Sequence, residues 1–268
     1  MNFIKINTVL ILTFFMCFSM SVKSADITEV GAANNTENRF VGYAYSLDGE
    51  ELLYSEHHLI MSTADNQRLY STVHYKSSEG KVIADKTLKY DETGYFPSFN
   101  FLDLRTDQIL NVENFGKKIT ITQGDNLAEK GRRDVESINP LKKGVMIADA
   151  GFDVFMMKNW PALTAGETKI VDFLAPTRGM FVSFEIKQIF KNNSIVQFSL
   201  APDNFFISML VDPIFLEYDL ASGRILSYKG LTNVEQSING KATGNNYIAH
   251  IKYKYSDDPL KVSAKNGI

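Results

Sequence analysis

The residues that could do chemistry are few, and several of them are carboxylates or histidines on predicted strands. Glu56 precedes His57 and His58, and His74 and Asp85 lie on the two strands that follow. A histidine held between two carboxylates can carry a proton or join a metal site. The row Glu56–His74–Asp85 is therefore a candidate catalytic site. A solvated ladder of opposite charges across the strands is the favoured interpretation.

A second candidate pair is Asp149 and Asp153, which helical spacing puts on one face, one turn apart. Paired carboxylates can act as acid and base, as they do in glycosidases. The competing interpretation is structural: Asp149 caps the start of a helix, and Asp153 lies in its first turn, where the helix dipole favours an anion. We favour the cap, because both acids match the rule for a helix start.

Metal and cofactor chemistry have little support in the sequence. His57 and His58 are adjacent on a strand, so they point to opposite faces and cannot share one ion. The single cysteine, Cys17, lies within the N-terminal apolar run, which removes disulfides, thiol catalysis and cysteine-bound zinc from the rest of the chain. The sequence contains no GxSxG, P-loop or GxGxxG motif. We therefore expect no metal and no cofactor.

The elements that must position these residues are short, regularly spaced strands. The pattern predicts strands over Arg39–Leu47, Glu50–Ser62, Arg68–Ser77, Lys81–Asp91, Phe99–Leu104, Ile109–Phe115, Lys117–Gln123, Glu167–Leu174, Met180–Phe190, Ser194–Leu200, Ile214–Leu220, Arg224–Val234 and Asn246–Tyr255. Such strands without helices between them are typical of an antiparallel sheet. A sheet of about ten or more strands curls. We expect a mainly β protein, a curved antiparallel sheet or incomplete barrel, wrapped around one central buried helix.

The turns set which residues face each other. Turns at Asp48-Gly49 and Glu79-Gly80, with Ser62 opposite Arg68, predict the pairs Tyr45–Leu52, Tyr43–Tyr54, Glu56–His74 and His74–Asp85. The core face of these strands is then predicted to carry Phe40, Ala44, Leu53, Leu59, Met61, Leu69, Val73, Tyr75, Val82, Ala84, Leu88 and Tyr90. The opposite face would carry Tyr43, Tyr45, Tyr54, Thr72, Lys76, Thr87 and Lys89.

The central helix is predicted over Val145–Trp160, an apolar stretch rich in Met and Phe. Its side chains Phe152, Phe155, Met156 and Trp160 are either plain core or the lining of a cavity for a lipid-like ligand. Plain core is the more common role, since large pockets are few per protein. These four residues are nevertheless the candidates for ligand binding.

The chain is predicted to contain one β-rich domain with polar extensions. The order is a signal peptide at 1–24, a flexible leader at 25–38, the domain at 39–256 and a tail at 257–268. Within the domain, the charged stretch 124–144 has the length of a lid rather than of an ordinary connection. Asp203–Val211 is compatible with a second short helix, capped by Asp203.

The N-terminus predicts export. Lys5 is followed by the apolar run Val9–Val22 and a small-residue cleavage site at Ser24. That run is short for a membrane span and no second one follows, so we expect no span after cleavage. Loss of Lys5 and Lys23 leaves 26 of the 28 basic residues against 31 acidic ones, a balance that argues against nucleic acid as a partner. We expect a periplasmic or secreted protein.

Several segments resemble an uncharacterised family of exported, periplasmic proteins of Gram-negative bacteria. They are Tyr43–His58, Val73–Tyr90, Asp149–Trp160 and Tyr218–Val234. The resemblance spans most of the chain after residue 24 and implies no activity. In layout the chain is also similar to periplasmic lipoprotein carriers, in which a curved half-barrel covers an apolar cavity closed by helices. Such an analogy of fold does not establish function.

These observations predict a non-enzymatic periplasmic protein that binds a lipid-like or other apolar ligand, or an envelope partner. One alternative is a hydrolase of envelope glycans or lipids that uses Asp149 and Asp153, or Glu56, His74 and Asp85. The other is a structural or assembly protein without a ligand. The sequence leaves the oligomeric state open. A continuous apolar cavity against the central helix would favour the first function.

Overall fold

A computed structural model describes residues 35–115, 118–125, 133–135, 145–204, 212–238 and 241–256. The predicted signal peptide and tail, residues 25–34 of the leader, and most of the lid-like stretch 124–144 lie outside the described residues, as does the second helix after residue 204. The strand β1 already begins at Thr36, so the prediction of a leader as far as residue 38 is wrong at its C-terminal end.

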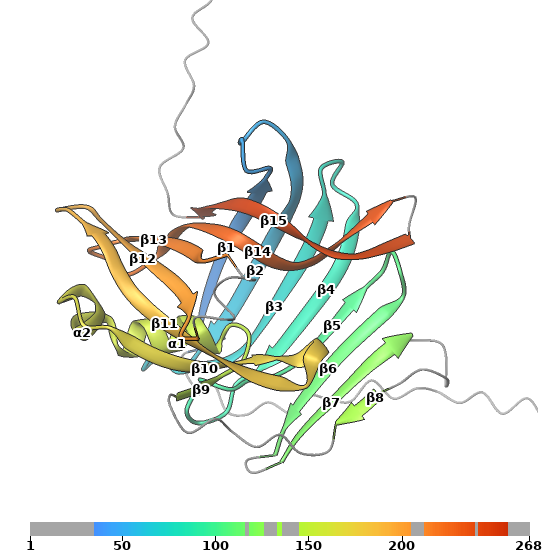
Figure 1. The fold of residues 1–268 in the computed structure, drawn as a ribbon, viewed down its shortest axis with the longest axis horizontal. Coiled ribbons are helices and arrows are strands. Elements are labelled where there is room, and N and C mark those ends of the chain that lie inside the picture. Colours follow the sequence, from blue (N-terminus) through green and yellow to red (C-terminus); the bar gives the residue numbers. More distant parts are fainter. Residues whose placement is uncertain are drawn as a thin grey trace, which may run out of the picture. The chain divides into compact units, whose positions relative to one another are not determined.

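The described chain forms one sheet of 15 strands with short helices (Figure 1). The strands are β1 (Thr36–Tyr45), β2 (Leu52–Ser62), β3 (Arg68–Ser77), β4 (Val82–Lys89), β5 (Ser98–Asp103), β6 (Gln108–Asn114), β7 (Ile119–Asp125), β8 (Arg133–Val135), β9 (Val145–Ile147), β10 (Lys169–Ala175), β11 (Met180–Lys191), β12 (Ile195–Pro202), β13 (Ile214–Asp219), β14 (Ile225–Ile238) and β15 (Lys241–Tyr255). The helices are α1 (Gly151–Lys158), α2 (Trp160–Thr164) and the 3₁₀-helix η1 (Pro176–Arg178). The prediction of a mainly β protein is confirmed.

The sheet consists of two arms joined through the four central strands β2, β1, β15 and β14. From one edge to the other the order is β8-β7-β6-β5-β4-β3-β2-β1-β15-β14-β13-β12-β11-β10-β9. All neighbours pair antiparallel except β9 and β10, which are parallel. We call β3 to β8 the first arm and β9 to β13 the second arm.

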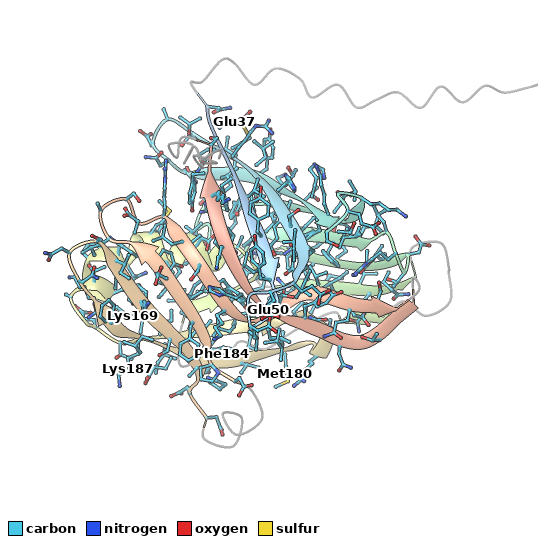
Figure 2. The ribbon with its side chains drawn as sticks, turned by 90° about the horizontal axis from the view of Figure 1, so that it is seen from above. Glu37, Glu50, Lys169, Met180, Phe184 and Lys187 are labelled. Carbon is cyan, nitrogen blue, oxygen red and sulfur yellow. The ribbon has the colours of Figure 1, made fainter. Side chains whose placement is uncertain are left out.

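The sheet is curved, and the two arms contact each other. One hydrophobic cluster combines Leu88, Phe99 and Val112 of the first arm with Leu174 and Phe181 of the second. Side chains project from both faces of the sheet (Figure 2). On β11, for example, Phe184 packs against the core while Lys187 is exposed. The curvature therefore brings residues far apart in sequence to one interior.

Several predicted pairs of the first strands are confirmed. Tyr45 lies opposite Leu52, Ser62 opposite Arg68, and His74 opposite Asp85. The loop between β1 and β2 spans residues 46–51 and is longer than the two-residue turn that the Asp48-Gly49 signal predicts. A hydrogen bond from the Ser46 backbone N–H to the Glu51 carbonyl closes this loop.

β-Bulges then change the register away from these turns. A bulge between β1 and β2 pairs Tyr54 with Ala44 instead of Tyr43. A second bulge leaves Leu69 without a partner on β2, so that Glu56 lies opposite Tyr75 and not opposite His74. A bulge of one residue moves the following side chains to the other face.

The predicted core face is consequently correct in part. Buried as predicted are Phe40, Ala44, Val73, Tyr75, Ala84, Leu88 and Tyr90. Not fully buried are Leu53, Leu59, Met61, Leu69 and Val82. Tyr54, predicted on the outer face, is completely buried.

The prediction of one buried helix over Val145–Trp160 is wrong in its bounds and its burial. Residues Val145–Ile147 form β9, and α1 begins only at Gly151. The fold requires glycine there, since a Cβ at Gly151 would lie 1.9 Å from the Tyr95 carbonyl oxygen. The helix is also not enclosed on every side, because Met157 is 56% exposed.

Candidate functional site

The predicted row Glu56–His74–Asp85 exists only in its second half. His74 Nδ1 and Asp85 Oδ1 are 2.6 Å apart, on a face where the two side chains are 58% and 39% exposed. Glu56 lies on the opposite face and is buried, because the bulge at Leu69 shifts β2 by one residue. The histidine is therefore not held between two carboxylates, and the prediction of this row as one site is wrong.

Glu56 instead pairs on the buried face of the sheet with His58 of the same strand. His58 Nε2 lies 3.1 Å from Glu56 Oε2, and the His58 ring stacks on Phe40 at 4.4 Å. His57 points the other way, to Ser55 Oγ at 3.1 Å, and burial lowers its pKa. The two adjacent histidines thus serve different faces, as predicted. No group of three or more His, Cys, Asp or Glu residues that could hold a metal occurs among the described residues.

Asp149 and Asp153 are each engaged by a separate cation. Asp149 adopts a φ of 44° before the helix, and its Oδ2 accepts a hydrogen bond from Lys86 Nζ at 2.8 Å. Ala150, not Asp149, occupies the N-cap position, so that prediction is wrong. Asp153 does lie in the first turn of α1, and its carboxylate is 3.4 Å from Arg68 Nη1. Two ion pairs therefore tie the start of α1 to the first arm.

Lys86 is a functional candidate that was not predicted from the sequence. Its side chain is 5% exposed and faces the rings of Tyr75 and Phe101 at 5.8 and 6.0 Å. Burial lowers the pKa of the ammonium, but the Asp149 carboxylate and the Tyr75 hydroxyl together more than offset this and leave that pKa above its ordinary value. The two-residue period of a strand predicts that Lys86 is buried, because it lies between Ala84 and Leu88 on the buried face of β4.

The Lys86–Asp149 pair borders a cavity of about 140 Å³ between the two arms, which we call the seam cavity. Six of the eleven lining residues are apolar: Phe99, Phe101 and Leu110 from the first arm, and Phe173, Leu174 and Pro176 from β10 and η1. Its polar groups are Lys86, Asp149, Thr177, Asn233 and Asn246. Thr177 and Asn233 are exposed, whereas Phe99 and Leu174 are buried, so the cavity has both a mouth and a floor.

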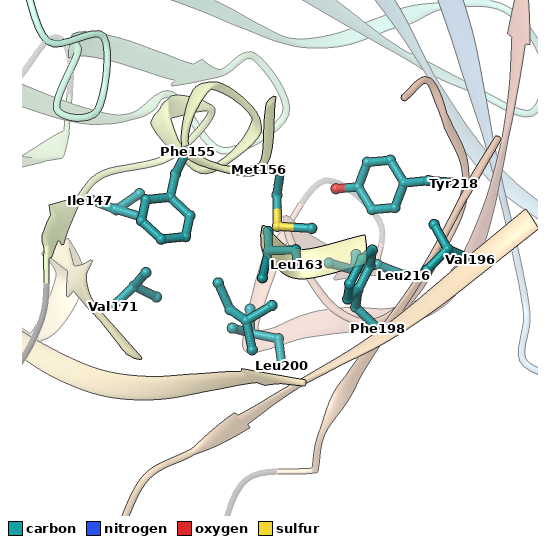
Figure 3. Packing of buried hydrophobic residues seen from close by; sticks show 11 residues of the cluster. Ile147, Phe155, Met156, Leu163, Val171, Val196, Phe198, Leu200, Leu216 and Tyr218 are labelled. Carbon is teal, nitrogen blue, oxygen red and sulfur yellow. The ribbon is translucent and has the colours of Figure 1, made fainter. Parts of the chain in front are cut away.

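The predicted ligand-binding residues belong to a neighbouring core cluster, shown in Figure 3. Phe155 and Met156 are buried there, among side chains of β10, β12 and β13. Trp160 packs against Phe198, and Phe152 lies 6.4 Å from Phe173, which borders the seam cavity. Ligand binding by these four residues stays a prediction, and their contacts are those of a packed core.

The same core cluster contains a buried hydroxyl without a partner. Tyr218 Oη makes no hydrogen bond within the described structure, although the residue is only 3% exposed. The rings of Trp160 and Phe198 pack against it, and burial raises the pKa of this phenol well above its ordinary value.

Tyr218→Phe is therefore expected to raise the free energy of unfolding by about 1 kcal/mol, since a buried unsatisfied hydroxyl costs about 1–3 kcal/mol. Urea unfolding monitored by circular dichroism measures the change. Tyr90→Phe is the matched control. The Tyr90 hydroxyl is hydrogen-bonded to Ser71 and Arg68, so its removal is expected to destabilise the protein. A Tyr218→Phe variant less stable than the parent would contradict the assignment.

Comparison with known proteins supplies little beyond this geometry. No protein-family model matches the chain, and no curated protein matches it. Among solved structures, the chain is similar to a β-barrel-like protein of the domain of unknown function DUF1849 from Brucella abortus, with 7% sequence identity and a TM-score of 0.40. The match covers 82% of this chain and 94% of the other. Among the described helices, none is long and apolar enough to cross a membrane.

Proposed function

We propose that this chain is a non-enzymatic exported protein that binds a small apolar or lipid-like ligand in the seam cavity. The observation that carries the proposal is a cavity lined by three phenylalanines, two leucines and a proline together with five polar or charged residues. Ligand sites are commonly apolar concavities of this kind, in which a few polar groups fix orientation. The export signal in the sequence supports a role outside the cytoplasm.

The size of the cavity limits what can enter. An engineered apolar cavity of about 150 Å³ binds benzene, and the seam cavity, at about 140 Å³, has a similar volume. It holds one ring or a short alkyl segment, so a longer lipid would place only part of its chain inside. The predicted helix residues can support such a site indirectly, because Phe152 packs against the lining residue Phe173.

The hydrolase alternative receives no support from the described geometry. Its first set of residues is split between two faces of the sheet. In its second set, Asp149 and Asp153 are ion-paired with Lys86 and Arg68, respectively. A pair of carboxylates that serves as acid and base needs one member free to hold a proton. An envelope partner in place of a small ligand stays a prediction.

Thr177→Trp tests the proposal, because Thr177 is exposed and borders the cavity, so an indole there can block the mouth without disturbing the core. Isothermal titration of the purified chain with benzene or 1-hexanol is expected to give a Kd on the order of 0.1–1 mM. Thr177→Trp is expected to weaken that binding at least about tenfold, which is about 1.4 kcal/mol.

The matched control is Thr87→Trp, the same change at an exposed position on β4 that does not border the cavity. It should bind both probes as the parent does. Absence of any saturable binding to the parent, or equal binding by Thr177→Trp, would rule out the seam cavity as the ligand site.

A further inference from the structure

We infer that the seam cavity selects ligands whose polar end is uncharged, such as an alcohol or an amide, over carboxylates, phosphates and ammonium groups. This inference rests on the proposed function and specifies its ligand class. The basis is that the charges lining the cavity cancel. Among the described lining residues the charged ones are one cation, Lys86, and one anion, Asp149.

Lys86 and Asp149 form an ion pair with each other. Lys86 Nζ donates to Asp149 Oδ2 at 2.8 Å, and the side chains are only 5% and 12% exposed. The ammonium also faces the rings of Tyr75 and Phe101, which favour a cation. Asp149 is held from its other side by the Ala150 backbone N–H, which donates to Oδ1 at 2.8 Å. Separating a buried ion pair is strongly unfavourable, so the pair remains closed and adds no net charge.

The other polar groups of the cavity are neutral. Asn233, Asn246 and Thr177 supply amide and hydroxyl groups. Asn246 Nδ2 already donates to the Thr232 carbonyl at 2.8 Å, which orients its own side-chain carbonyl as an acceptor. Such groups complete hydrogen bonds with a hydroxyl or an amide, since each of these can donate and accept.

A charged ligand end would gain little here. A carboxylate close enough to Lys86 would also lie close to Asp149, so attraction to one is opposed by repulsion from the other. An ammonium group meets the same two ions with the signs exchanged. In both cases the ligand's ion loses its hydration, and no unpaired opposite charge in the cavity compensates that loss. An uncharged end loses less on leaving water and still finds hydrogen-bond partners.

Four probes of one chain length test the inference at pH 7: 1-hexanol, hexanamide, hexanoate and hexylammonium, each titrated calorimetrically into the purified chain. The two neutral probes are expected to bind at least tenfold more tightly than the two ions. Benzene has no polar end, so its binding tests whether the cavity takes up an apolar ligand at all, whatever the preference among polar ends. If benzene and the neutral probes all fail to bind, the proposed function fails. If benzene binds but hexanoate or hexylammonium binds as tightly as hexanol, only the inference fails.

Asp149→Asn provides a second test, because it keeps the side-chain shape, and asparagine tolerates the positive φ at this position. The change leaves Lys86 without its counter-charge, so hexanoate is expected to gain at least tenfold relative to hexanol. An unchanged preference in a folded variant would show that the ion pair does not set selectivity. The ranking of the four probes with the unaltered chain decides the matter even where this variant is too unstable to study.

Discussion

Lys86→Met is expected to lower the free energy of unfolding by about 3–5 kcal/mol, the effect of leaving one buried charge without its partner. Methionine keeps most of the side-chain volume, so the loss comes from Asp149, whose carboxylate is 12% exposed and accepts from Lys86 Nζ at 2.8 Å. Urea unfolding of the purified variant measures the change from the midpoint and the slope.

Two further variants separate this effect from lost packing. Lys89→Met makes the same substitution at an exposed position of the same strand and is expected to change stability by no more than about 0.5 kcal/mol. The double variant Lys86→Met with Asp149→Asn removes both charges and should recover most of the loss, because no uncompensated ion remains. If Lys86→Met is as stable as the parent, the buried ion pair described here does not exist in solution.

Gly151→Ala is expected to destabilise the protein by about 3 kcal/mol, the upper end of the usual cost of overpacking. Helix propensity alone predicts the opposite sign, since alanine is favoured over glycine in a helix by about 1 kcal/mol. The steric effect decides, because the new Cβ would lie 1.9 Å from the Tyr95 carbonyl oxygen and 2.5 Å from its carbon. Both are backbone atoms, which a rotamer change cannot move aside.

Gly166→Ala is the control for Gly151→Ala. Its Cβ would meet no atom within 4 Å, although its φ of +92° is unfavourable for alanine, so the expected loss is only about 1–2 kcal/mol. Thermal unfolding of the two variants side by side gives the comparison. A Gly151→Ala variant more stable than the parent would mean that α1 does not approach Tyr95 as closely as the structure shows.

Much of the sheet could be predicted from the sequence because strand period and turn residues are local signals. The predicted strand over Arg68–Ser77 has the bounds of β3, and the turn at Glu79-Gly80 correctly placed His74 opposite Asp85. The bulge at Leu69 could not be predicted in the same way. One extra residue in a strand leaves no periodic signature, yet it carried Glu56 to the interior and separated it from His74.

The segment before α1 shows a second limit. Val145–Ile147 reads as the start of an apolar helix, but its pairing with β10 makes it a strand. That pairing depends on residues distant in sequence, so tertiary structure overrides the local pattern. Lys86 is the opposite case. Its position between buried residues on β4 was readable in the sequence, but its partner Asp149 is remote along the chain, and only the folded sheet brings the two together.

Methyl NMR during a titration with benzene shows whether the seam cavity is a ligand site. If benzene enters the cavity, the methyl groups of Leu110 and Leu174, which border it, show saturable shift changes. The methyl groups of Leu163, buried in the neighbouring core cluster, should remain unchanged. Shifts that do not saturate, or that occur at Leu163 and not at Leu110 and Leu174, would contradict binding in the seam cavity.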